Sequence, residues 1–333
     1  MLEALFELIM FASKGLIIIF FIAIFILILI FFIAALAKIK DKFKDGRLVI
    51  KNINEKYAAV KESLLNEILP KKHFKQFLKK KKADEKAASK EEKMKHIYVL
   101  HFNGDIKASA VSTLREEITA ILHIAEKNDE VILCLESAGG MVNGYGLAAS
   151  ELLRLRNRQI VLTIAIDKMA ASGGYMMAAV ADKIICAPFS IIGSIGVVVQ
   201  LPNFHRYLQD KHVDFEQHTA GEYKRTISLF GENTEAGRQK LQQEIENIHG
   251  QFKQLIANHR KQINIQQVST GEYWLGQEAL KLNLVDELKT SDEYILECTE
   301  SAKVYELYYE IRKPLLSRLS NQASLIREKI FGI

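Results

Sequence analysis

Apolar residues form one long uncharged run near the N-terminus. Residues 15–36 (GLIIIFFIAIFILILIFFIAAL) include no charged or strongly polar side chain. As a helix they would span about 33 Å, enough to cross a hydrocarbon core of roughly 30 Å. Residues 35–37 (Ala-Leu-Ala) resemble a cleavage site, but a cleaved signal peptide has an apolar run of only about 7–15 residues. We therefore expect a short tail (1–14) and an uncleaved transmembrane anchor (15–37).

A polar extension, residues 38–95, follows the anchor. Its segment 46–70 alternates apolar and charged positions, which predicts a short strand followed by an amphipathic helix. Residues 71–95 are rich in lysine and have little to bury, which indicates a solvated, flexible linker. The alternative is contact with anionic lipid head groups, because the expected membrane segment is near in sequence.

From His96 onward the pattern changes to short apolar runs separated by helical stretches. The runs 97–102, 131–137 and 160–166 predict strands buried on both faces, and 109–127 and 144–157 predict helices. This alternation, with glycine-rich junctions, predicts an α/β fold built of βαβ units around a mainly parallel sheet. A long polar helix is expected at 233–262, and residues 291–333 close the chain with a strand and a helix, the latter over 314–333.

Charge and cysteine usage narrow the function classes. The 333 residues carry a net charge of only +5, with the basic residues concentrated near the N-terminus, so we expect no nucleic-acid partner. Cys134, Cys186 and Cys298 are widely spaced and form no CxxC pair. We interpret them as small core residues and expect neither a metal nor a cofactor.

Three glycine-bearing junctions follow predicted strands. In the first, residues 136–141 (ESAGGM), consecutive glycines permit a sharp turn that exposes backbone N–H groups, although a plain strand-to-helix turn would look the same. In the second, residues 167–175 (DKMAASGGY), Ser172 begins a helix. It is either an ordinary N-cap or an exposed nucleophile beside the positive helix end, which can stabilise an oxyanion.

The third junction, residues 192–197 (IGSIGV), leads into a further apolar run that predicts another strand. Farther on, residues 221–226 (GEYKRT) place Lys224 in a loop. Such a lysine is normally surface charge, but burial would favour its neutral amine, which could act as a general base. A serine nucleophile requires a base of this kind.

Together these segments, in this order and spacing, resemble the signal peptide peptidase A family, most closely its SohB branch. The likeness covers roughly residues 96–290, and the anchor with residues 46–95 resembles the N-terminal extension of that branch. The resemblance implies a serine endopeptidase with a Ser/Lys dyad. It makes Ser172 the nucleophile, Lys224 the base and Ser194 the residue that orients the lysine.

The resemblance also assigns the oxyanion hole. Gly139 or Gly140 would supply one backbone N–H and Gly173 the other, while residues 274–287 (WLGQEALKLNLVDE) match a further family segment. One departure is Ala138, which stands where the family usually has proline. Losing that proline removes a fixed φ and loosens the turn, but the backbone donors remain.

The implied fold is a ClpP/crotonase-like spiral of ββα units, preceded by the transmembrane helix. Relatives assemble into rings or domes, so we expect a homo-oligomer with the helix at 233–262 as an interface element. The dyad forms either within one subunit or between two. Expected substrates are peptides or unfolded segments near the bilayer, including signal peptides.

Three alternatives remain open. A histidine base could be His205, His212 or His218, although no aspartate-bearing motif marks one of them, despite Asp210 and Asp214 nearby. The chain could instead be a crotonase-like acyl-CoA enzyme or a catalytically silent membrane scaffold.

Two indications of membrane orientation disagree. The basic residues after the anchor favour a catalytic domain in the cytoplasm. The family resemblance, which we follow, favours the periplasmic face of a bacterial inner membrane.

Overall fold

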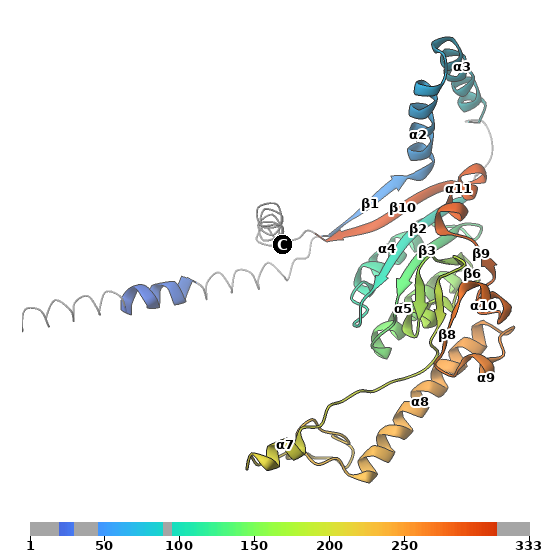
Figure 1. Cartoon of the computed structure of the whole chain (residues 1–333). Coiled ribbons are helices and arrows are strands. Elements are labelled where there is room, and N and C mark those ends of the chain that lie inside the picture. The colour runs from blue at the N-terminus through green and yellow to red at the C-terminus, as the bar shows by residue number, and fades with distance from the viewer. Residues whose placement is uncertain (1–19, 30–45, 89–94, 312–333) are drawn as a thin grey trace, which may run out of the picture. The chain divides into compact units, whose positions relative to one another are not determined.

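The computed structural model describes residues 20–29, 46–88 and 95–311, and the chain divides into two compact units (Figure 1). One unit comprises both chain ends, Met1–Arg47 and Glu310–Ile333. Within it, residues 20–29 are helical and Arg47 pairs with Glu310 at 3.0 Å. The other unit, Leu48–Tyr309, contains nearly all of the sheet and every glycine-bearing junction.

The predicted anchor is described only over residues 20–29, whose large apolar side chains are exposed. Across the described ranges, no helix combines the length and the apolar composition needed to cross a bilayer. The rest of the predicted anchor, the tail 1–14 and the predicted terminal helix 314–333 lie outside the described residues.

One sheet organises the larger unit. Its main path runs β1–β10–β2–β3–β4–β6–β9, and the contacts from β10 through β9 are parallel. These strands are β1 (Gly46–Asn52), β2 (His96–Gly104), β3 (Glu130–Ser137), β4 (Val161–Ile166), β6 (Lys183–Cys186), β9 (Glu287–Leu288) and β10 (Lys303–Ile311). The predicted α/β class with a mainly parallel sheet is confirmed.

A branch leaves this path at the end of β3. It consists of β5 (Met169–Ala171), β7 (Ile191–Gly193) and β8 (Tyr273–Leu275), with β7 and β8 antiparallel. The chain therefore passes from a long strand to a short one and then to a helix, as in β4–β5–α6 (α6, Gly173–Ala178), which is the ββα pattern that was expected.

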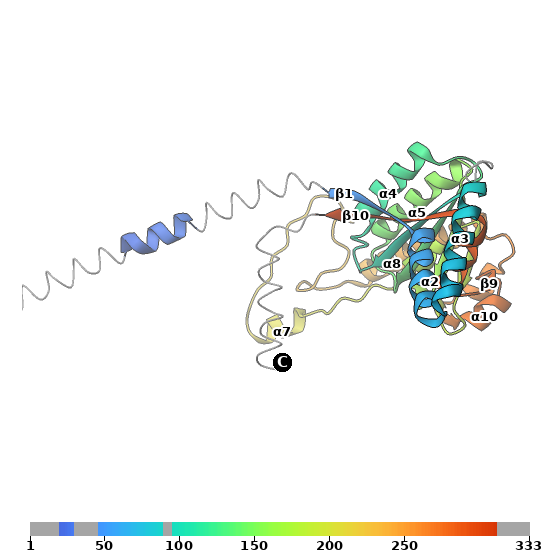
Figure 2. The same ribbon diagram turned by 90° about the horizontal axis from the view of Figure 1, so that it is seen from above.

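Helices cover both faces of the sheet, which explains why its strands are apolar at nearly every position. Leu100 and Phe102 of β2 pack on one face with α4 (Val111–Ile124) and α5 (Val142–Asn157). Ile97 and Val99 point to the other face, toward α2 (Ile53–Ile68) and α11 (Ser291–Ser301). Figure 2 shows α4 and α5 on one side of the strands and α2 on the other.

The remaining helices are α3 (Lys71–Ala88), α7 (His205–Asp210), α8 (Glu235–His259), α9 (Ile265–Val268) and α10 (Gly276–Lys281). The helices predicted over 109–127, 144–157 and 233–262 are confirmed as α4, α5 and α8. The strand expected after the third junction is absent, because residues 197–204 are irregular and Val198 is largely exposed.

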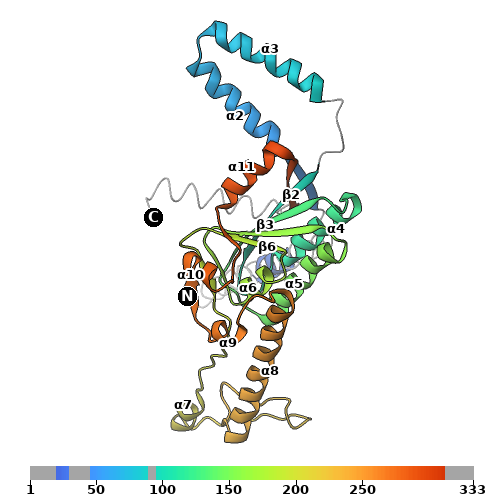
Figure 3. The same ribbon diagram turned by 90° about the vertical axis from the view of Figure 1, so that its right-hand side faces the viewer.

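The structure also differs from the expected linker. Residues 71–88 form helix α3, which makes a hairpin with α2 (Figure 3). Phe74 and Phe77 stack at 6.4 Å, and Lys81 binds Glu62 of α2 at 2.8 Å. These contacts give the lysine-rich stretch a helical partner that its composition does not reveal.

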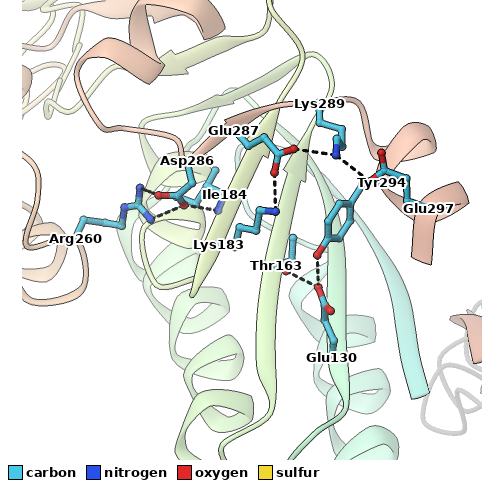
Figure 4. Close-up of polar contacts among 10 residues, drawn as sticks. All are labelled: Glu130, Thr163, Lys183, Ile184, Arg260, Asp286, Glu287, Lys289, Tyr294 and Glu297. Atoms are coloured by element: carbon cyan, nitrogen blue, oxygen red, sulfur yellow. Dashed lines mark hydrogen bonds and ion pairs between the residues drawn. The ribbon is translucent and has the colours of Figure 1, made fainter. Parts of the chain in front are cut away.

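A buried ion pair fastens the C-terminal end of α8 to the sheet (Figure 4). Both Asp286 oxygens accept from Arg260 at 2.8 Å, and one also accepts from the Ile184 N–H at 2.7 Å. The Arg260 side chain is only 2% exposed, so its charge depends on this one carboxylate.

We predict that Asp286→Ala lowers the free energy of unfolding by about 3 kcal/mol, since it leaves the Arg260 guanidinium buried without its counter-charge. Glu287→Ala is the matched control. This carboxylate pairs with Lys183 and Lys289, whose side chains are 35% and 16% exposed, so water can solvate both cations once it is removed and the loss should be far smaller. Urea unfolding measures both. If both variants lost the same free energy of unfolding, the Arg260–Asp286 pair would contribute no more to stability than the Glu287 pairs.

Candidate active site

The register of three parallel strands brings the glycine-bearing junctions together. Ser137 of β3 lies opposite Ala170 of β5, and Ala171 of β5 lies opposite Gly193 of β7. Because parallel strands end at the same edge, the turns that follow them are neighbours. A stretch of 36 positions separates Ser137 from Gly173 in the sequence, yet their turns touch in space.

Ser172 occupies an unusual backbone conformation at the start of α6. Its φ is 51° and its ψ is −117°, a combination that residues with a side chain rarely adopt. The turn is fixed on both sides, because the Ser172 N–H donates to the Gly193 carbonyl at 2.8 Å and its carbonyl accepts from the Met176 N–H at 2.9 Å. A serine held this way at a strand-to-helix turn is the geometry of a nucleophile elbow.

The Gly139–Gly140 turn lies directly against this serine. A methyl group on Gly139 would come within 2.7 Å of both the Ser172 Cβ and the Gly173 nitrogen, and Gly139 has a φ of +88°. A side chain on Gly173 would overlap the ring of Tyr145, which is completely buried. Glycine is required at both positions, so that two backbones and one aromatic ring can approach closely.

A chain of hydrogen bonds holds the first turn in place. The Gly139 N–H donates to Ser137 Oγ at 3.0 Å, and Ser137 Oγ lies 2.6 Å from the Tyr145 hydroxyl. That hydroxyl donates to the Asp105 carbonyl at 2.8 Å. Burial raises the pKa of Tyr145, so the phenol stays protonated and keeps its donor role.

The Gly140 N–H is the donor of this turn that remains available. Within the described residues it donates to no protein group, whereas the Gly139 N–H is committed to Ser137. The turn is also anchored by the Met141 N–H, which donates to the Ile106 carbonyl at 2.8 Å. Of the two glycines that the sequence offered, Gly140 is therefore the one whose N–H has no acceptor among the described residues.

The third junction is built around Ser194, which has a φ of 51° and is half-buried. Its N–H donates to the Glu272 carbonyl at 2.7 Å, and a side chain on Gly193 would come within 2.7 Å of the Trp274 ring. His249 of α8 reaches the Ile195 carbonyl at 3.2 Å. These contacts show that the segment around Trp274 packs against the third glycine junction.

Lys224 does not lie with the three neighbouring turns. It is exposed, and it lies in the irregular segment that extends away from the sheet beside the N-terminal end of α8 (Figures 1 and 3). The structure thus brings Ser172, Ser194 and the three glycines together, whereas the burial that would make Lys224 a base is not met within a single chain.

The histidines proposed as alternative bases occupy the same segment. His205 contacts the Phe230 carbonyl at 3.3 Å, and His218 lies 3.5 Å from Glu216. In the described part of the chain, none of the three pairs with Asp210 or Asp214, so no aspartate–histidine arrangement is formed there.

The cysteines are held as thiols. Cys186 is fully buried, and burial raises the pKa of Cys134 to about 12 and that of Cys298 to about 11. These pKa values oppose thiolate chemistry and suit the expected role of small core residues. Over residues 20–29, 46–88 and 95–311, no group of three histidine, cysteine or acidic residues could hold a metal ion.

Comparison with known proteins gives two family matches and several similar relatives. The model described as Peptidase family S49 N-terminal matches residues 3–152, and that described as Peptidase family S49 matches 154–305. A Haemophilus influenzae protein called probable protease SohB is 54% identical over 70% of this chain and 66% of its own length. A Buchnera aphidicola protein called putative protease SohB is 42% identical over 93% of this chain and 92% of its own.

Among solved structures, a variant of the 1510-N membrane-bound stomatin-specific protease aligns with 62% of this chain and 85% of its own. It is 16% identical, with a TM-score of 0.42. This likeness is weak, and the fold is assigned from the sheet itself.

We predict that Gly173→Ala destabilises the protein by about 1–3 kcal/mol, because the added methyl group overlaps the Tyr145 ring in a packed interior. Gly146→Ala is the control. That glycine lies inside α5 with open space around it, so alanine should stabilise the helix by about 0.5–1 kcal/mol. Thermal unfolding measures both, and a neutral Gly173→Ala would contradict the close approach of Tyr145.

Proposed function

Because the chain belongs to peptidase family S49 as a SohB-type member, we propose that it is a serine endopeptidase with Ser172 as its nucleophile. The observation that carries this proposal is the strained turn at Ser172, packed against the Gly139–Gly140 turn. Backbone strain persists only where the surroundings enforce it, and here it holds Ser172 beside backbone N–H groups that have no protein acceptor among the described residues.

In the proposed reaction, Ser172 Oγ attacks the carbonyl carbon of a peptide bond. The N–H groups of Gly140 and Gly173 donate to the oxyanion of the tetrahedral intermediate, since neither has a protein acceptor in the part of the chain that the structure describes. Neutral Lys224 takes the serine proton and then protonates the leaving amine. Water, activated by the same amine, hydrolyses the acyl-enzyme.

Lys224 would reach Ser172 from a second copy of the chain. Support comes from the segment that carries it, where a lysine is exposed among many exposed apolar side chains, a pattern typical of an interaction surface. They include Val198, Val199, Leu201, Phe204, Tyr207, Val213, Phe215, Tyr223, Leu229 and Phe230. Packing this segment and α8 against a neighbour would desolvate Lys224, and Ser194 would then orient the amine.

The substrates we propose are peptides or unfolded segments close to a membrane, including signal peptides. Ile106 is 74% exposed and Met141 is 49% exposed, and both flank the Gly140 donor, so an apolar substrate side chain could rest there. We further propose that residues 15–37 anchor the protein in a bacterial inner membrane, with the catalytic domain on the periplasmic face. The relatives named above are bacterial.

We predict that Ser172→Ala abolishes cleavage of a denatured model protein and of a synthetic signal peptide, while Lys224→Ala lowers kcat by about 10²–10⁴-fold. The purified full-length protein is assayed, and oligomer size is checked for each variant. Full activity of Lys224→Ala would exclude the lysine as base. If neither the wild type nor the two variants cleave either substrate although their oligomers are intact, the alternative of a catalytically silent membrane scaffold would be favoured.

Mixing the two variants tests whether the dyad forms between subunits. In random mixed oligomers, about one quarter of the sites (half times half) would combine an intact Ser172 and an intact Lys224 from different chains. We therefore predict recovery of roughly that fraction of wild-type activity after co-expression. No recovery would place both residues in the same chain.

A further inference from the structure

We propose that Tyr145 is a positioning residue that sets the direction of the oxyanion turn, a role that rests on the proposed peptidase function. Among the described residues, the Tyr145 hydroxyl bonds to Ser137 and Asp105 and not to Ser172. Tyr145 acts through Ser137 and Gly139, and it belongs to α5, an element outside the glycine-bearing junctions.

The hydrogen-bond chain has only one possible direction. A carbonyl oxygen can only accept, so the Tyr145 proton must point to Asp105. In the 2.6 Å contact with Tyr145, Ser137 is therefore the donor. The Ser137 oxygen then has its lone pairs left for the Gly139 N–H. The sequence of donors is Gly139, Ser137, Tyr145, and the final acceptor is Asp105.

This direction decides which amide of the turn is free. Ser137 takes up the Gly139 N–H, which leaves the Gly140 N–H without a protein acceptor among the described residues. Without the Tyr145 oxygen, the Ser137 hydroxyl would lose its acceptor and could rotate. The lone pair that holds Gly139 would then no longer be fixed, and the Gly140 donor would lose its alignment.

Tyr145 also defines the position of the second donor. Its ring packs against Gly173, at a distance that leaves no room for a side chain, while its hydroxyl holds the first turn. One buried side chain therefore sets both backbone donors relative to each other. A second contact reinforces this: Gly104 approaches the Ser137 and Tyr145 hydroxyls so closely that a methyl group there would overlap both.

Tyr145→Phe tests the hydroxyl alone, because it removes the hydroxyl while the ring and its packing against Gly173 remain. We expect kcat to fall about 10- to 100-fold with KM nearly unchanged, since binding is kept while the oxyanion donors lose their alignment. Ser137→Ala should give a similar loss, and the double variant should lose no more than the larger single loss, because both belong to one chain.

Tyr294→Phe is the matched control. It also removes a tyrosine hydroxyl that donates a hydrogen bond, in this case to Glu130 at 2.9 Å, at the opposite end of β3. It should leave kcat unchanged even if it lowers the melting temperature. A fall in kcat for Tyr294→Phe equal to that of Tyr145→Phe would overturn the proposal, because general destabilisation would then explain both.

Hydrogen exchange of the backbone amides at residues 138–140 gives a readout that does not depend on activity. Tyr145→Phe should speed exchange at Gly139 at least tenfold, whereas Tyr294→Phe should not. If the wild type cleaves nothing, the peptidase proposal fails while this measurement still tests the hydrogen-bond chain. Unchanged exchange, an unchanged kcat in an active enzyme, or additive losses in the double variant would each overturn the role of Tyr145.

Discussion

The parallel register of β3, β5 and β7 is the constraint on which the candidate site depends. These strands end at the same edge of the sheet. The three turns that follow them are distant in the chain, but the strand register makes them neighbours. The register is held in turn by a sheet whose alternate residues are buried on opposite faces. A slip of one residue would turn those side chains to the wrong face, so the core protects the alignment of the turns.

The site has two parts that differ in how they are held. The serine turn, the glycine turn and Ser194 are fixed by short backbone hydrogen bonds and by close glycine contacts inside one compact unit. The segment carrying Lys224 is held mainly by its own contacts, such as the bonds from Asn203 to the Ser228 and Gly231 carbonyls. One chain thus presents an ordered serine turn and a projecting apolar segment, an arrangement suited to assembly between identical copies.

Much of this could be predicted from the sequence, because its strongest signals are local. Apolar runs and glycine junctions predicted the α/β class, three helices and the strand ends that carry Ser172 and Gly139. Composition gave the wrong impression of residues 71–88, since a helix can be stabilised by a neighbour such as Glu62 despite its many lysines. The apolar run after Ser194 was equally misleading, because exposure of Val198 reflects a surface and not a strand. Tyr145 was missed because its role arises from contacts with Ser137 and Asp105, and no spacing rule links those positions.

The place of β10 in the sheet has a consequence for how the protein is made. Lys303 of β10 pairs with His96 of β2, so one edge of β2 stays unpaired until a strand roughly two hundred residues later has been synthesised. During translation, the edge of β2 is an open row of backbone donors and acceptors, a surface prone to mispairing with other chains. The β2 edge stays unpaired until β10 has left the ribosome, so a chain terminated before Lys303 would keep this edge exposed and be a natural target for quality control.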